Sequence, residues 1–123
     1  AVALSIAHDS HNIIVVGVSD EEMEFAVNSL IAQEGGMVLV KEGKVIESMP
    51  MPIAGLMSDQ SGEWVDEKLT AIHAKAYEEL GIAGDVEPVM TLCFMSLAVI
   101  PEVKLTDMGL FDVTTFSFIP VEA

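Results

Sequence analysis

The sequence predicts an α+β fold, a mixed α/β sandwich in which β-hairpins and two main helices pack on a mixed sheet. Short runs rich in Val and Ile alternate irregularly with longer stretches at helical spacing, and no internal repeat is present. The irregular order argues against a doubly wound parallel sheet. A chain of 123 residues can bury a continuous core without disulfides or structural metal, so we expect one domain over residues 1–123.

The N-terminal third is predicted to form a hairpin and a helix. Residues 2–7 and 13–18 are typical of strands, and the five residues between them suit a hairpin loop. Ser19 followed three positions later by Glu22 forms a capping box, which begins a helix. The pair Gly35-Gly36 ends that helix.

The middle of the chain is predicted to hold a second hairpin and a long helix. Residues 37–41 and 44–49 form strands joined across Glu42-Gly43, and prolines 50 and 52 then stop the pairing. Residues 53–57 are expected to make a helical turn. A helix over about residues 61–80 has apolar side chains on one face and ends at Gly81. His73 lies beside that face, where a packed or solvated side chain is expected.

The C-terminal third is predicted to contain two more strands. Residues 89–99 are apolar without clean alternation, which favours a central strand buried on both faces. Residues 105–112 are turn-like, and residues 114–119 form the last strand. Asp59, Asp107 and Asp112 stand in loops, where carboxylates usually serve turns and caps.

Composition excludes some partners and favours others. The formal net charge is −15, from 20 acidic and 5 basic residues, which disfavours nucleic acid and anionic membranes. No apolar run approaches the roughly 20 residues of a membrane span. Hydrophobic residues make up 51% of the chain, so we expect an apolar face that meets another domain or subunit, as in a homo-oligomer. The single cysteine, Cys93, and the lack of a basic signal-peptide region predict a reducing, cytoplasmic location.

One loop carries most of the chemically capable side chains, namely His8, Asp9, Ser10, His11 and Asn12. Two imidazoles and a carboxylate supply metal ligands, but in an extended backbone His8 and His11 point to opposite faces, so a metal site requires a tight turn. A histidine oriented by Asp9 is also a candidate proton carrier or substrate contact. Alternatively, the loop is turn chemistry alone, with Asp, Ser and Asn side chains bonded to nearby backbone.

Four segments of the sequence resemble a known family. They are AHDSHNII at residues 7–14, PIAGLMS at 52–58, MTLCFM at 90–95 with VIP at 99–101, and KLTDMGLF at 104–111. In this order and at these separations they closely resemble the C-terminal domain of bacterial adenine deaminases of the amidohydrolase superfamily. The similarity runs from Ala3 to about Phe118. Cys93 stands where relatives often have serine, which is a small departure.

The resemblance implies part of a metal-dependent hydrolase of purine metabolism. The whole enzyme would convert adenine to hypoxanthine and ammonia, with manganese or iron bound in a (β/α)₈ barrel. The family's metal ligands begin with a His-x-His motif, which this chain lacks, so no metal ligand and no certain catalytic residue is carried over. The isolated domain is therefore expected to be inactive, with the barrel as its partner and the loop from His8 to Asn12 facing the barrel or a subunit interface. The alternative is a related, non-catalytic module for binding or oligomerisation.

Overall fold

The computed structural model describes residues 1–122 and confirms the α+β class, with three helices and two antiparallel sheets. The elements are β1 (Val2–Leu4), β2 (Ile14–Val16), α1 (Asp20–Ala32), β3 (Gly36–Lys41), β4 (Lys44–Pro50), α2 (Gly62–Glu78), α3 (Pro88–Phe94), β5 (Val103–Thr106), β6 (Gly109–Asp112) and β7 (Ser117–Ile119). The larger sheet has the strand order β2-β1-β3-β4, and the smaller sheet has the order β5-β6-β7.

Every pairing between these strands is antiparallel, which corrects the prediction of a mixed sheet. The reason lies in the position of β1. Helix α1 connects β2 to β3, but β1 lies between those two strands, so the strands joined by the helix never pair. Hairpins make the other connections within each sheet.

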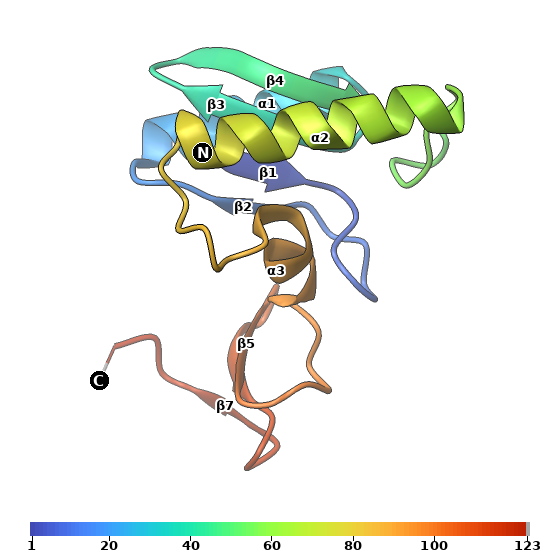
Figure 1. The fold of residues 1–123 in the computed structure, drawn as a ribbon. Coiled ribbons are helices and arrows are strands. Elements are labelled where there is room, and N and C mark those ends of the chain that lie inside the picture. Colours follow the sequence, from blue (N-terminus) through green and yellow to red (C-terminus); the bar gives the residue numbers. More distant parts are fainter. Residues whose placement is uncertain (123) are drawn as a thin grey trace.

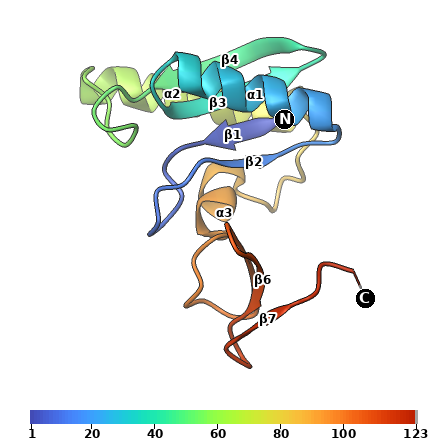
Figure 2. The same cartoon turned by 180° about the vertical axis from the view of Figure 1, so that it is seen from behind.

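The larger sheet is covered on both faces. Helix α1 lies on one face and α2 on the other, as the two opposite views show (Figures 1 and 2). Helix α3 lies next to β2, and its buried side chains join the cluster under α2. Side chains of β1 alternate between the layers: Ala1 and Ala3 pack with α1, whereas Val2 and Leu4 pack with α2 and α3. The domain thus has two hydrophobic clusters, one on each side of a central strand.

Serine side chains cap both long helices, at Ser19 as predicted and at Ser61, where a helix start was predicted without a cap. The side chains of Ser19 and Ser61 accept hydrogen bonds from Glu22 N–H and Trp64 N–H, and they begin α1 and α2. In a complete capping box the Glu22 carboxylate would also accept from the N–H of Ser19. That part of the prediction is wrong, because the carboxylate instead accepts from the N–H of Glu42 at 2.5 Å and lies 3.5 Å from the nitrogen of Ala1. Glu22 therefore connects α1 to the end of the sheet.

Two predicted elements differ from the structure. The apolar stretch expected as a buried strand over residues 89–99 contains α3, because Glu87 caps a helix there and Pro88 occupies its first turn. The expected helical turn over residues 53–57 is a tight loop closed by a single bridge between Ile53 and Met57. Ala54 and Gly55 both have positive φ, which a helical turn does not allow.

Ser5 holds that tight loop to the sheet. Its hydroxyl donates to the carbonyl of Gly55 at 2.5 Å and accepts from the N–H of Gly36 at 2.8 Å. Ser5 is buried, so both partners are needed to satisfy its polar oxygen. The segment 52–58, which supports the family resemblance, is thus attached to the end of β1.

The smaller sheet extends from the end of α3, away from the larger one (Figures 1 and 2). The predicted turn-like segment 105–112 is mostly a hairpin, formed by β5 and β6. No residue of this sheet belongs to either buried cluster. Within residues 1–122, no helix is long and apolar enough to span a membrane.

Candidate functional site

The loop from His8 to Asn12 is a tight turn held by its main chain. The N–H of His11 donates to the carbonyl of Ala7 at 2.7 Å, and the N–H of His8 donates to the carbonyl of Cys93 at 2.9 Å. His11 has φ of +54°, a left-handed conformation that lets the chain reverse. The Cys93 thiol donates to the carbonyl of Ile6 at 2.9 Å, so α3 holds the chain where it enters the loop.

The five side chains of the loop face outwards, and all five residues are exposed. The His8 ring stacks on Phe94 of α3, with centroids 5.2 Å apart and planes inclined by 28°. Among residues 1–122, none of these five side chains forms a hydrogen bond with another residue. The polar groups of Asp9, Ser10 and Asn12 therefore do not hold the turn, and their hydrogen-bonding capacity is open to solvent or a partner.

A metal site is not formed by this loop. The tight turn that such a site requires is present, yet no group of three or more His, Cys, Asp or Glu side chains converges on a possible metal position in the described part of the chain. His8 is instead placed against an aromatic ring. Within residues 1–122, the side chains therefore form no cluster that could hold manganese or iron.

Helix α3 positions the loop, and it is itself tied to α2 by a histidine. His73 Nε2 pairs with a carboxylate oxygen of Glu87, whose other oxygen accepts from the N–H of Met90 and caps α3. His73 therefore has a structural partner that its sequence context did not reveal. The dipeptide Glu87-Pro88, an acidic cap before a first-turn proline, signals the start of α3 but not its contact with His73.

A recess of about 200 Å³ lies beside the loop and joins two of the segments that carry the family resemblance. It is lined by Asn12, Ile13, Ile14, Ser96, Leu105, Thr106 and Asp107. The hydroxyl oxygen of Ser96 is buried there and has no hydrogen-bond partner in the described residues. The fold thus places the loop next to the start of the smaller sheet, over 90 positions along the sequence.

The other candidate acids have local roles. The hydroxyl of Thr114 donates to the Asp112 carboxylate and is the main cause that lowers the pKa of Asp112. Hydrogen bonds from Thr115 and from the N–H of Thr114, at 2.8 Å, lower it further. Asp59 accepts from the side chain of Gln60 at 2.9 Å. These two aspartates are turn residues, as the sequence suggested, whereas Asp107 lines the recess.

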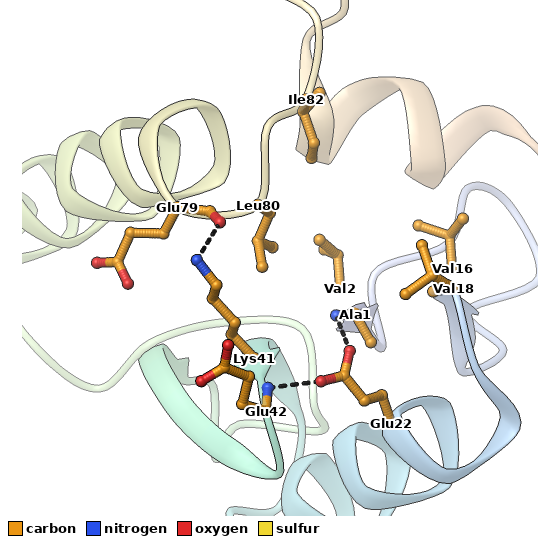
Figure 3. Close-up of a pocket in the computed structure, with 11 residues that line it drawn as sticks. Ala1, Val2, Val16, Val18, Glu22, Lys41, Glu42, Glu79, Leu80 and Ile82 are labelled. Carbon is orange, nitrogen blue, oxygen red and sulfur yellow. Dashed lines mark hydrogen bonds and ion pairs between the residues drawn. The ribbon is translucent and has the colours of Figure 1, made fainter.

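A larger pocket of about 410 Å³ opens at the other end of β1, near Ala1. Figure 3 shows Glu22, Lys41 and Glu79 around it, with apolar side chains between them. Lys41 Nζ donates to the carbonyl of Glu79 at 2.8 Å, which links the end of β3 to the end of α2. Sequence reasoning did not point to this pocket.

Comparisons with known proteins agree on one family. The family profile described as "Adenine deaminase C-terminal domain" matches residues 1–117. The chain is 75% identical over its whole length to adenine deaminase 2 of Desulfotalea psychrophila and 54% identical over 119 residues to the adenine deaminase of Halalkalibacterium halodurans. It is 47% identical over 122 residues to the adenine deaminase of Bacillus subtilis. The chain spans only 20–21% of the length of these relatives.

Proposed function

Because the chain belongs to the adenine deaminase C-terminal domain family, we propose that it serves as the C-terminal domain of an enzyme that hydrolyses adenine to hypoxanthine and ammonia. The whole-chain match at 75% identity to a protein named adenine deaminase is the observation that carries this proposal. The proposal includes the cytoplasm as location, purine metabolism as context and a barrel of the amidohydrolase superfamily as the catalytic part. Manganese or iron would be held by that part, and this chain would supply no ligand.

The loop from His8 to Asn12 is proposed as one wall of the site in the whole enzyme. Its exposed imidazoles, carboxylate and amide make no internal hydrogen bonds among residues 1–122, so binding a partner or substrate breaks none. The stack of His8 on Phe94 fixes the direction of that ring without using its nitrogens. Imidazole groups near neutral pH bind or transfer protons readily, which suits the surroundings of a hydrolytic site.

The smaller sheet is proposed as the surface that docks on the rest of the same polypeptide. Phe111 packs edge-on against Phe116 and Phe118, at centroid distances of 5.2 and 5.3 Å. Phe116 and Phe118 are 78% and 53% exposed, although aromatic clusters of this kind normally lie in cores or interfaces. Most of each relative's length lies outside the matched region, and that remainder is the occupant to which we assign this surface.

Activity assays test the central part of the proposal. The purified 123-residue chain with added manganese or iron should show no adenine deamination, while the full-length enzyme should be active. In the full-length enzyme, His8→Ala or His11→Ala should lower kcat/KM by about tenfold or more. Glu24→Ala, an exposed change on α1, is the matched control and should leave the rate unchanged. Turnover by the isolated chain, or equal rates in all three variants, would contradict the proposal.

Self-association is the other role that the sequence suggests, and the exposed aromatic face is the observation that favours it. Light scattering on the 123-residue chain and on the full-length enzyme separates the two occupants. Dimers of the isolated chain that dissociate on Phe118→Ser would assign the face to a second copy. A monomeric chain whose face becomes protected only in the full-length enzyme would assign it to the catalytic part.

A further inference from the structure

We propose that the pocket beside Ala1 is a strand-binding slot, filled in the intact enzyme by the residues that lead into Ala1 and continue β1. This inference rests on the proposed function only in assuming the longer polypeptide that the relatives possess. The occupant is therefore a segment of the same chain, extended and apolar. The positions of β1, β2 and β3 around the pocket support this proposal.

The antiparallel pairing of β1 with β3 includes Ala1, and a strand continued upstream from Ala1 would enter the pocket. The nitrogen of Ala1 donates to the carbonyl of Val40 at 2.6 Å, and the N–H of Val40 donates back to the carbonyl of Ala1 at 2.8 Å. These two bonds form one rung of an antiparallel ladder. The next residue upstream would lie opposite Lys41, which lines the pocket.

On its other side, β1 pairs with β2, and the residue before Ala1 would lie next to unpaired main chain that follows β2. Val2 pairs with Val16, so the residue before Ala1 would lie opposite Val18. Val18 is 96% exposed, and its main chain forms no hydrogen bond within residues 1–122. An extended residue in the slot would meet an unpaired N–H and C=O on that side, as strand addition requires.

Gly17 allows the strands to lie this close. A Cβ at Gly17 would come within 3.0 Å of the Ala1 Cβ and 2.7 Å of Met23 Cγ. A side chain at this position would require Met23 to move, so glycine suits the narrow space between β1 and α1. Because Gly17 lies close to Ala1, the chain that follows β2 stays next to the position of the proposed segment.

Alternation along β1 predicts which way the added side chain points. Ala1 and Ala3 pack with α1, whereas Val2 and Leu4 pack towards α2 and α3. The residue before Ala1 should therefore point to the α2 side, where Leu80 and Ile82 line the pocket (Figure 3). Apolar walls on that side favour an apolar side chain.

The slot also defines where the catalytic part is attached. It lies at the start of β1, whereas the loop from His8 to Asn12 follows the end of that strand. The connecting segment would thus join the domain at one end of β1, and the loop proposed to face the site lies at the opposite end. The catalytic part would have to reach along the domain to meet both.

Two extended forms of the chain test the proposal. One form carries Gly-Val directly before Ala1, and the other carries Gly-Asp, so that only one side chain differs. The valine form should melt several degrees above the aspartate form, because its side chain is buried against Leu80 and Ile82. Val18 N–H should also exchange more slowly in the valine form. Equal melting temperatures and equal exchange would overturn the proposal.

The full-length enzyme provides the second arm. Replacing the residue that precedes Ala1 by Asp should lower its Tm relative to replacement by Val, and no difference would contradict the slot. Adenine deamination by the full-length enzyme is measured separately. A failure of the slot would leave that activity intact, whereas a failure of the proposed function would appear only in the activity assay.

Discussion

The larger sheet, β2-β1-β3-β4, lies between helices of its own chain, whereas the smaller sheet, β5-β6-β7, has no residue in either buried cluster. In β3, every residue from Gly36 to Val40 is buried. In the smaller sheet, no residue of the three strands is buried. Three strands this short gain little from their own pairing in water. The first region buries a core of its own, whereas the second exposes the aromatic side chains that we propose are covered by the catalytic part.

The two ends of β1 differ in the same way, since one end lies near the smaller sheet and the other lies within the larger sheet. One end carries the exposed loop from His8 to Asn12, which lies beside the recess next to the smaller sheet. The other end carries the pocket at Ala1, bordered by secondary structure of the larger sheet. The surfaces proposed to meet the catalytic part thus lie near the smaller sheet, whereas the proposed slot for the preceding segment lies at the opposite end of β1.

The largest effect is expected for Gly36→Ala in the larger sheet. Gly36 has φ of +107°, and a Cβ there would lie 2.0 Å from the carbonyl oxygen of Met49. Backbone atoms of a paired strand cannot move aside cheaply, so the loss should exceed about 4 kcal/mol and prevent folding at ambient temperature. Circular dichroism and urea titration measure it.

Gly43→Ala is the matched control for that change. It also has a positive φ, +69°, but a Cβ there meets nothing within 4 Å. Its cost should stay near 1 kcal/mol, from backbone strain alone. If the two alanine variants were equally stable, close packing of β3 against β4 would not be the source of stability in this region.

A smaller loss is expected for Ser5→Ala. The change leaves the N–H of Gly36 buried without a partner and removes the donor to Gly55. We expect a loss of about 1–3 kcal/mol in the free energy of unfolding, measured by denaturant titration. Unchanged stability would mean that the segment 52–58 is held to the sheet by other contacts.

The stability changes caused by Phe118→Ser in the smaller sheet and Ile72→Ala in the larger region should differ clearly. For Phe118→Ser in the isolated chain we expect a change within about 0.5 kcal/mol, because this side chain is 53% exposed. Ile72→Ala, at a fully buried position on α2, should cost about 2–5 kcal/mol in the same chain. In the full-length enzyme, Phe118→Ser should lower Tm by several degrees. A large effect in the isolated chain would show that the smaller sheet has a core of its own.

The last prediction concerns a small, pH-dependent contribution of Glu47 on β4 to stability. Burial raises the pKa of this carboxyl, but bonds from Lys68 and Ser48 N–H and the charge of Lys75 outweigh it, so the pKa falls below 4.5. A lowered folded-state pKa gives stability that is full above 4.5 and is lost as pH falls through the folded value. Glu47→Gln should therefore cost about 0.5–1 kcal/mol at pH 7 and less at pH 3. An unfolding titration at both pH values checks this, and a constant difference would contradict it.

Local signals in the sequence predicted much of the larger sheet and its helices. Ser19 marked the start of α1 because capping depends on a few neighbouring residues, and the apolar face over residues 61–80 marked α2. Helix α3 was assigned as a strand because seven residues are too few for an apolar stripe to show helical periodicity. The Glu87-Pro88 cap was the local sign that distinguished it.

The candidate loop was identified from its residue types, but its surroundings were not. The recess beside Asn12 is completed by residues around position 106, and such long-range contacts leave no periodic pattern in a single sequence. The same holds for Ser5, whose role appears only when Gly36 and Gly55 are brought to it. Tertiary contacts rather than propensities decided these features.

Hydrogen exchange in the isolated chain and in the full-length enzyme tests the two-region account most directly. Amides of β1 and β3 should be strongly protected in both forms. Amides of β5–β7 should exchange quickly in the isolated chain and become protected in the full-length enzyme, where we propose that the catalytic part covers that sheet. Equal protection of β5–β7 in both forms would contradict the account.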